Sequence, residues 1–276
     1  SAASDVYKRQ VITRPEIMKI TKDSEGNEFA ELSGSFAANA GITVRGTYQE
    51  DDSFHMDYYY PYVFGTSITT NEQIDVEKHA EKESYAGVCD EVNLGVTLIF
   101  YIQNVADYLA ETNRHLSKIH YGAMLAGLST EGKILCPVVE RKKNDVPAIQ
   151  KNDRHNQLIA QAREGDEDAI ESLTLEDMDT YALLSQRVMK EDIFSIVKST
   201  FMPFGIESDQ YTVLGEIIDC VTMENKLTHE KLYGMKLLCN NIQFDVCINE
   251  KDLLGEPAIG RRFRGNVWMQ GNLCLE

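Results

Sequence analysis

Apolar and polar residues alternate with a period of two through residues 41–62, interrupted by a polar turn at residues 50–53. Successive side chains of a β-strand point to opposite faces of a sheet, so this alternation predicts a β-hairpin. We expect one face of the hairpin to carry Ile42, Val44, Tyr48, Phe54, Met56, Tyr58 and Tyr60.

The spacing changes after residue 95. Leu98, Ile102, Val105 and Leu109 recur at helical intervals, which predicts an amphipathic helix over residues 95–111 that packs on the sheet. Apolar runs then return on either side of a polar turn at residues 129–132, which predicts a second hairpin. The first half of the chain is therefore expected to be an antiparallel sheet with a packed helix.

The second half starts with a polar stretch at residues 140–154, which contains Pro147 and is typical of a linker. Helices are expected over 156–163, over 166–173 and from 174 onward, forming a helical connector. Strands are expected at residues 211–221, 231–238, 242–248 and 263–273. Their short connections favour a small antiparallel β-sheet or a partly closed barrel. The fold class predicted from these patterns is α+β.

The predicted domains are an N-terminal α+β domain at residues 11–145 and a helical segment plus small β-domain at residues 146–276. Residues 1–10 are treated separately. They resemble the peptide that arises when sequencing-adapter DNA is translated, so we interpret them as a non-native artefact and expect the natural N-terminus to be missing.

The net negative charge of the chain argues against some classes of binding partner. The chain has 27 Lys and Arg against 44 Asp and Glu, a formal net charge of −17, and residues 164–179 hold eight acids with no Lys or Arg. Affinity for nucleic acid and anionic lipid depends on cationic contacts, so neither is expected as a partner. Hydrophobic residues make up 43% and charged residues 26%, which is typical of a folded globular protein.

The six cysteines are widely spaced and several lie in apolar runs, which is typical of reduced, buried thiols in the cytoplasm. The apolar run at residues 96–102 is far shorter than the roughly 20 residues of a membrane span. No signal peptide is visible. We therefore predict a cytoplasmic protein with no membrane association.

Three partial motifs in the sequence do not predict a catalytic or metal-binding site. Residues 127–134 match phosphate-loop spacing, but Ile134 replaces the magnesium-binding Ser or Thr, and a hairpin turn with positive φ at Gly132 explains the stretch better. His229 begins a zincin-like segment, but Tyr233 stands where the second His is required. A nucleophile pair of Cys89 and His79 is disfavoured because Cys89 lies in an apolar strand. We predict no catalytic residue, no metal site and no cofactor.

One alternative remains open. Asp177, Asp179, Glu207 and Asp209 could gather in the fold as an acid/base pair or cation site, giving a hydrolase or transferase. A helix face solvated by its own charges explains the same acids.

The last predicted strand offers the best candidate for recognition. One of its faces is apolar, and the other carries Arg262, Arg264, Asn266, Trp268, Gln270 and Asn272. Such a face can stack on and hydrogen-bond a sugar, base or peptide. Packing of Trp268 under the other domain or in a self-interface is the structural alternative. The predicted binding residues are Arg262, Arg264, Trp268 and Gln270.

Four runs of sequence resemble a family from anaerobic Firmicutes bacteria described as domain-of-unknown-function family 3881. They cover residues 79–105, 171–188, 201–212 and 244–272, and with their spacing they extend over nearly all of the chain after residue 30. The resemblance implies no assigned activity, so it transfers no catalytic residue to this chain.

Taken together, these observations predict a binding or regulatory interaction module without catalytic activity. Its partner is expected to be a protein or a small polar ligand, and self-association fits the same surface. The alternative is the hydrolase or transferase built from distant acids.

Overall fold

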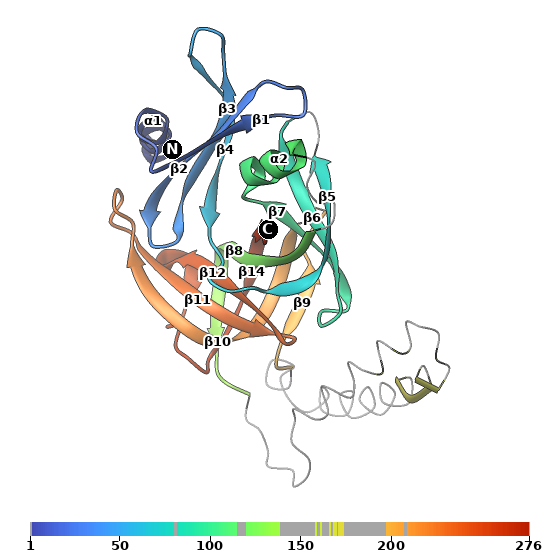
Figure 1. Ribbon diagram of the computed structural model, residues 1–276. Helices are drawn as coiled ribbons and strands as arrows, with labels where there is room; N and C mark the ends of the chain where they lie inside the picture. The colour runs from blue at the N-terminus through green and yellow to red at the C-terminus, as the bar shows by residue number, and fades with distance from the viewer. Residues whose placement is uncertain are drawn as a thin grey trace.

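The computed structural model describes residues 2–79, 82–114, 120–138, 197–206 and 209–275, together with residues 158, 161, 166, 168, 169 and 171–173. This part of the chain is mostly β (Figure 1). Two sheets account for its strands, one of four strands and one of ten. The predicted α+β class is therefore wrong. The predicted helical connector falls largely outside the described residues.

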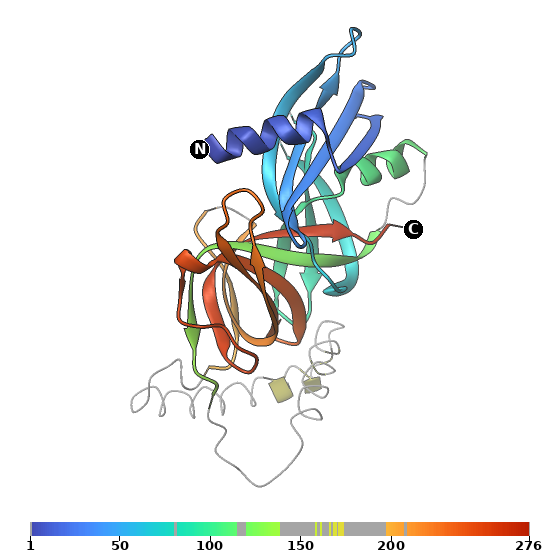
Figure 2. The same ribbon diagram turned by 90° about the vertical axis from the view of Figure 1, so that its left-hand side faces the viewer.

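The four-stranded sheet is antiparallel in the order β1-β2-β3-β4. Helix α1 (Ala2–Thr13) packs on one of its faces, where Val11 is buried among the apolar side chains of β2 and β3 (Figure 2). The hydroxyl of Tyr7 donates to Asn225 Oδ1 at 2.5 Å, so the segment interpreted as an artefact contacts the fold. The strands are β1 (Ile17–Lys22), β2 (Glu28–Ala37), β3 (Ala40–Tyr48) and β4 (Phe54–Val63).

The predicted first hairpin is confirmed as β3 and β4, but the shared face is not. Arg45 pairs with Tyr58 and Gly46 pairs with Met56, so Asp57 is an extra residue in β4. Such a β-bulge reverses which face the following residues occupy. Phe54 and Met56 therefore lie on the side of α1, while Tyr58 and Tyr60 point to the other face, toward Arg45.

The ten-stranded sheet closes on itself twice. Strands β10, β11, β12, β8 and β14 pair in succession, and β14 pairs back to β10. Strands β8, β5, β6, β7 and β14 close a second ring through the same β8–β14 ladder. The strands are β5 (Thr70–His79), β6 (Ser84–Glu91), β7 (Val96–Ile102), β8 (His120–Leu135), β9 (Thr200–Pro203), β10 (Gln210–Glu224), β11 (Lys231–Cys239), β12 (Ile242–Asn249), β13 (Leu253–Leu254) and β14 (Arg262–Leu273).

The four predicted C-terminal strands are confirmed as β10, β11, β12 and β14, but they do not form a sheet of their own. Their ring is completed by β8, which comes from the N-terminal side of the predicted domain boundary and runs parallel to β12. A single sheet therefore crosses that boundary. In Figure 2, β8 and β14 run side by side between the four-stranded sheet and the lower ring.

The predicted helix over residues 95–111 is wrong in its first half. Residues 96–102 form β7, and α2 (Val105–Asn113) begins only afterwards. A spacing of four residues fits a strand as well as a helix, because four is an even number. Leu98, Phe100 and Ile102 are all fully buried, which shows the period of two that decides the matter. The short 3₁₀-helix η1 (Glu250–Asp252) follows β12.

The second predicted hairpin is also wrong, because residues 120–135 form the single long strand β8. The polar residues taken as a turn surround a β-bulge, where Ser129 pairs with Val267 and Glu131 with Asn266. Gly132 lies within the strand rather than at a turn with positive φ. A Cβ at Gly132 would come within 2.4 Å of the Phe263 ring, so glycine serves close packing here.

Candidate functional site

Strand β14 presents two chemically different faces, as its sequence predicts. Phe263, Val267, Met269 and Leu273 are buried in the main core. The four predicted binding residues, Arg262, Arg264, Trp268 and Gln270, alternate with them on the opposite face. Their surroundings on that face differ, so each must be located separately.

Gln270 is completely buried and links the two sheets. Its Nε2 donates to the carbonyl of Pro61 at 2.9 Å. Its Oε1 accepts from Gln103 Nε2 at 2.7 Å and from the backbone N–H of Val63 at 3.3 Å. A side chain bonded in this way positions β14 under β4, and a ligand has no access to it.

Arg262 is also buried, with 5% of its surface exposed. Its guanidinium donates to two backbone carbonyls, from Nε to Cys136 at 2.9 Å and from Nη1 to Val197 at 2.6 Å. Burial lowers the pKa of Arg262 below its ordinary value. Through these two bonds, Arg262 holds the backbone at Cys136 and at Val197, which lie before and after residues 139–196 in the chain.

Trp268 is half-buried and held on three sides. Its Nε1 donates to Asp209 Oδ2 at 2.7 Å. Its ring packs against Tyr101 and Tyr60, with centroid distances of 5.3 and 6.4 Å. The indole therefore has a fixed orientation and a satisfied N–H group, in a residue that is only partly buried.

Leu128 of β8 lies directly opposite Trp268, and polar, partly exposed residues continue along the same face. On β14, Asn266 accepts from Thr212 Oγ1 at 2.7 Å and donates through Nδ2 to Glu131 Oε1. Arg264 lies directly opposite Lys133 of β8. We call the half-exposed set Arg264, Asn266 and Trp268, with the adjacent Gln210, Thr212, Glu131 and Lys133, the Trp268 face.

The alternative acid cluster is not tested by the described residues. Asp177, Asp179 and Glu207 lie outside them. Asp209 is described, and its carboxylate accepts the indole N–H of Trp268.

A second polar centre was missed by the sequence analysis. Arg45 on β3 is fully buried and donates to the hydroxyls of Tyr58, Tyr60 and Tyr101 at 2.8–3.0 Å. It also donates to the backbone carbonyls of Ile102 and Gln103 and pairs with the carboxylate of Glu31. An Arg within the apolar run of β3, in a hairpin whose second strand carries Tyr58 and Tyr60, is the signal that sequence offered.

Burial shifts the titration of this centre. It raises the pKa of Glu31, of Tyr60 and of Tyr101 above their ordinary values. Burial by itself lowers the pKa of Arg45, but Tyr60 and Glu31 outweigh it, and the pKa lies well above its usual range. Because the guanidinium has no exposed surface, we assign the centre to structure rather than to binding.

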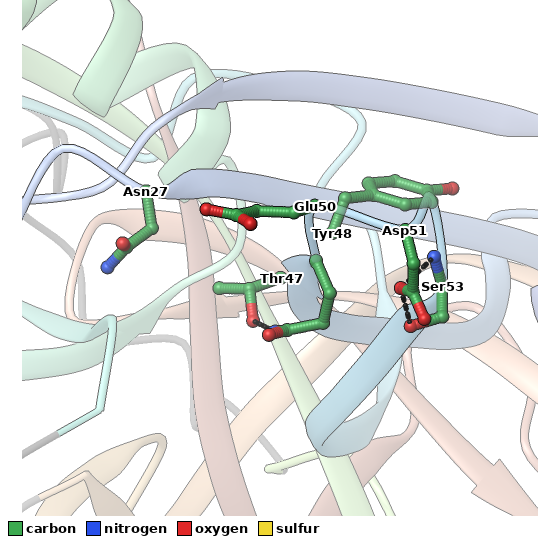
Figure 3. Close-up of a pocket in the computed structure, with 7 residues that line it drawn as sticks. Asn27, Thr47, Tyr48, Glu50, Asp51 and Ser53 are labelled. Carbon is green, nitrogen blue, oxygen red and sulfur yellow. Dashed lines mark hydrogen bonds between the residues drawn. The ribbon is translucent and has the colours of Figure 1, made fainter.

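Two concave regions lie among the residues that the structure describes. One, of about 670 Å³, lies at the tip of the β3–β4 hairpin and is lined by Asn27, Thr47, Tyr48, Glu50 and Asp51 among others (Figure 3). The carboxylate of Asp51 accepts from the backbone N–H and the hydroxyl of Ser53, so it stabilises the turn. This depression is therefore a consequence of the hairpin shape. The other is a cleft of about 200 Å³ beside β10, β11 and β12.

Sequence also raised Cys89 and His79 as a nucleophile pair. Burial raises the pKa of the Cys89 thiol to about 12, which disfavours the thiolate, and His79 is exposed at the end of β5. Across the described ranges, no group of three or more His, Cys, Asp or Glu side chains is placed to hold a metal ion. No helix in the described part of the chain is long and apolar enough to cross a membrane.

Comparison with known proteins gives one match. Residues 3–271 match the family model described as "Domain of unknown function, E. rectale Gene description". No curated protein and no solved structure matches the chain. The matched range covers nearly the whole sequence, including the N-terminal helix from residue 3. The chain therefore belongs to domain-of-unknown-function family 3881.

Proposed function

We propose that the protein is a cytoplasmic binding or regulatory interaction module, without chemistry of its own, that recognises a protein partner through the Trp268 face. The observation that carries this proposal is Trp268, which is half-buried and held in place by Asp209, Tyr101 and Tyr60. All six cysteines are free thiols, which supports a reducing compartment.

The contacts that hold Trp268 in place favour recognition because they reduce the free-energy cost of ordering this side chain on binding. Ordering a flexible side chain on binding costs roughly 0.5–1.5 kcal/mol, and a ring already fixed in the free protein avoids that cost. Tryptophan is enriched among the residues that dominate interface affinity. Asn266 and Arg264 follow on the same face of β14, so polar side chains continue along the surface from Trp268, as at the rim of an interface.

The shape of the surface favours a protein over a small molecule. Small ligands bind in concave sites that cover most of their surface. Neither of the two concave regions described above includes Trp268 or Arg264. A three-stranded surface built from β8, β14 and β10 suits the broad contact of a folded partner or a peptide.

The first test is the accessibility of Trp268. It is the only Trp in the chain, so its fluorescence reports on this surface alone. We expect acrylamide to quench the emission in the monomer. A blue-shifted emission that acrylamide fails to quench would contradict the proposal, and quenching that falls as protein concentration rises would identify the partner as a second copy of the chain.

The second test is capture of the partner from lysate of the native host, with Trp268→Ala as the variant. The matched control is Tyr121→Ala, which removes an aromatic residue with 60% exposure from β8. We expect the partner to be lost with Trp268→Ala and retained with Tyr121→Ala, at equal folded fractions by circular dichroism. Equal capture by the two variants would refute the role of Trp268.

A further inference from the structure

The cleft beside β10, β11 and β12 is separate from the Trp268 face. Its walls come from the β2–β3 turn at Asn39, the segment after β4 at Phe64 and Thr66, and the outward faces of the three strands. Its volume is about 200 Å³. The cleft thus suits a ligand smaller than those held by typical drug-sized pockets, which are about 300–1,000 Å³.

Three charged residues form a row across the cleft. Asp219 of β10 lies directly opposite Lys236 of β11, and Lys236 lies directly opposite Asp245 of β12. Directly opposite residues of antiparallel strands share one face, with Cβ atoms about 4.5–5.5 Å apart. All three line the cleft, so one cation stands between two anions at its wall.

These charges retain unused hydrogen-bonding capacity. In the described part of the chain, the Lys236 ammonium uses one of its three donors, to Ser67 Oγ at 3.1 Å. Asp245 Oδ2 accepts from the N–H and the hydroxyl of Thr66, and Oδ1 has no hydrogen-bond partner within the described part of the chain. Asp219 Oδ1 accepts from the N–H of Cys220. Both carboxylates thus keep one oxygen available.

The rest of the lining is apolar. Val63 and Val246 are buried in the fold and border the cleft, and Met223 is half-buried beside them. Val221 on β10 has 52% of its surface exposed although it lines the same cleft. A ligand with an apolar part would cover this valine and would contact the methyl group of Met223.

The geometry points to a binding site for a free α-amino acid with an apolar side chain. The ligand carboxylate pairs with the Lys236 ammonium, and its ammonium group pairs with the open oxygen of Asp219, while Asp245 on the other side of Lys236 adds negative charge to the cleft. The aliphatic side chain packs on Val221 and Met223. Charge supports a zwitterion over either single ion, because an anion alone meets two carboxylates and a cation alone meets Lys236.

The test uses L-leucine as the probe and the ¹³C-methyl spectrum of methionine as the reporter. The chain has nine methionines, and a Met223→Leu variant assigns the Met223 signal. We expect L-leucine to shift that signal in a saturable way. 4-Methylpentanoic acid lacks the ammonium group and 3-methylbutylamine lacks the carboxylate, so each should bind at least tenfold more weakly than L-leucine.

Two variants test the charges. Asp219→Asn changes an exposed side chain and leaves the strand pairing intact. Lys236→Met removes the central cation. Each variant should weaken L-leucine binding at least tenfold. Lys251→Met, on the exposed turn after β12, is the control and should bind normally. A Met223 signal that does not move at about 10 mM L-leucine, or equal binding of all three probes, overturns the proposal.

This site is independent of the proposed partner surface. Trp268→Ala should leave L-leucine binding unchanged, whereas Asp219→Asn should leave partner capture unchanged. Failure of one proposal is therefore distinguishable from failure of the other.

Discussion

The Nη2 atom of Arg45 lies 2.8 Å from Oε2 of Glu31, and the two side chains are 0% and 7% exposed. The residues stand directly opposite each other on β3 and β2. Their charges are thus sealed inside the protein, where the three tyrosine hydroxyls and two carbonyls around Arg45 satisfy the remaining donors. A buried charge that loses its partner is costly, because the low-dielectric interior solvates it poorly.

Arg45→Met should therefore lower the free energy of unfolding by about 3–5 kcal/mol, since it leaves the Glu31 carboxylate without its cation. Urea denaturation followed by circular dichroism measures this loss. Adding Glu31→Gln to Arg45→Met should recover part of it. The control is Lys251→Met, which breaks an exposed pair with Glu230 and should have no measurable effect.

Gln270→Ala should also act on stability rather than directly on partner contact. The substitution removes the bonds to Pro61 and Val63 of β4 and the bond to Gln103, which directly follows β7. Buried groups left without partners cost about 1–3 kcal/mol each, so we expect a loss of at least about 2 kcal/mol in urea denaturation. A stable Gln270→Ala variant would show that these bonds do not join the sheets.

Tyr211→Phe tests a side chain that joins two strands. The Tyr211 hydroxyl accepts from the backbone N–H of Ile99 at 2.8 Å and donates to the Ile99 carbonyl at 3.1 Å. Without it, both backbone groups lose a partner, and we expect a loss of about 1–3 kcal/mol in the free energy of unfolding. Tyr121→Phe, at an exposed site, should be neutral.

The same tyrosine predicts a dependence on alkaline pH. Burial raises the pKa of Tyr211 to about 12 from its ordinary value of 10.0, and that of Tyr62 likewise to about 12. The unfolded chain therefore loses these protons first as pH rises. Their contribution to stability is fully present below about pH 10 and is lost between pH 10 and 12. Urea midpoints measured across this range should fall, and Tyr211→Phe should fall less steeply.

The cysteines should react in two groups. Burial raises the pKa of Cys89 and Cys239 to about 12 and that of Cys247 to about 11, whereas Cys136 is exposed. At pH 8 a thiol of pKa about 12 is ionised in roughly one molecule in ten thousand, so it reacts slowly. Iodoacetamide labelling followed by mass spectrometry should modify Cys136 first. Rapid labelling of Cys89 in the folded protein would contradict this burial.

Several features were determined by the local sequence. The alternation in residues 263–273 correctly predicts both faces of β14, because a strand fixes side-chain direction through its own backbone. The hairpin at residues 41–62 was predicted for the same reason. The family resemblance is confirmed by the match over residues 3–271.

Pairing between distant strands was decided by the tertiary structure. Leu98 and Ile102 fit a helix or a strand equally well in sequence, and only pairing of β7 with β6 and β14 selects the strand. The bulge at Asp57 turns Tyr58 and Tyr60 toward Arg45, and no local pattern marks it. Gln270 and Trp268 share one face in sequence, but β4 covers Gln270 and leaves part of Trp268 exposed. Local sequence fixes which side chains share a face, whereas burial depends on what the rest of the chain places over that face.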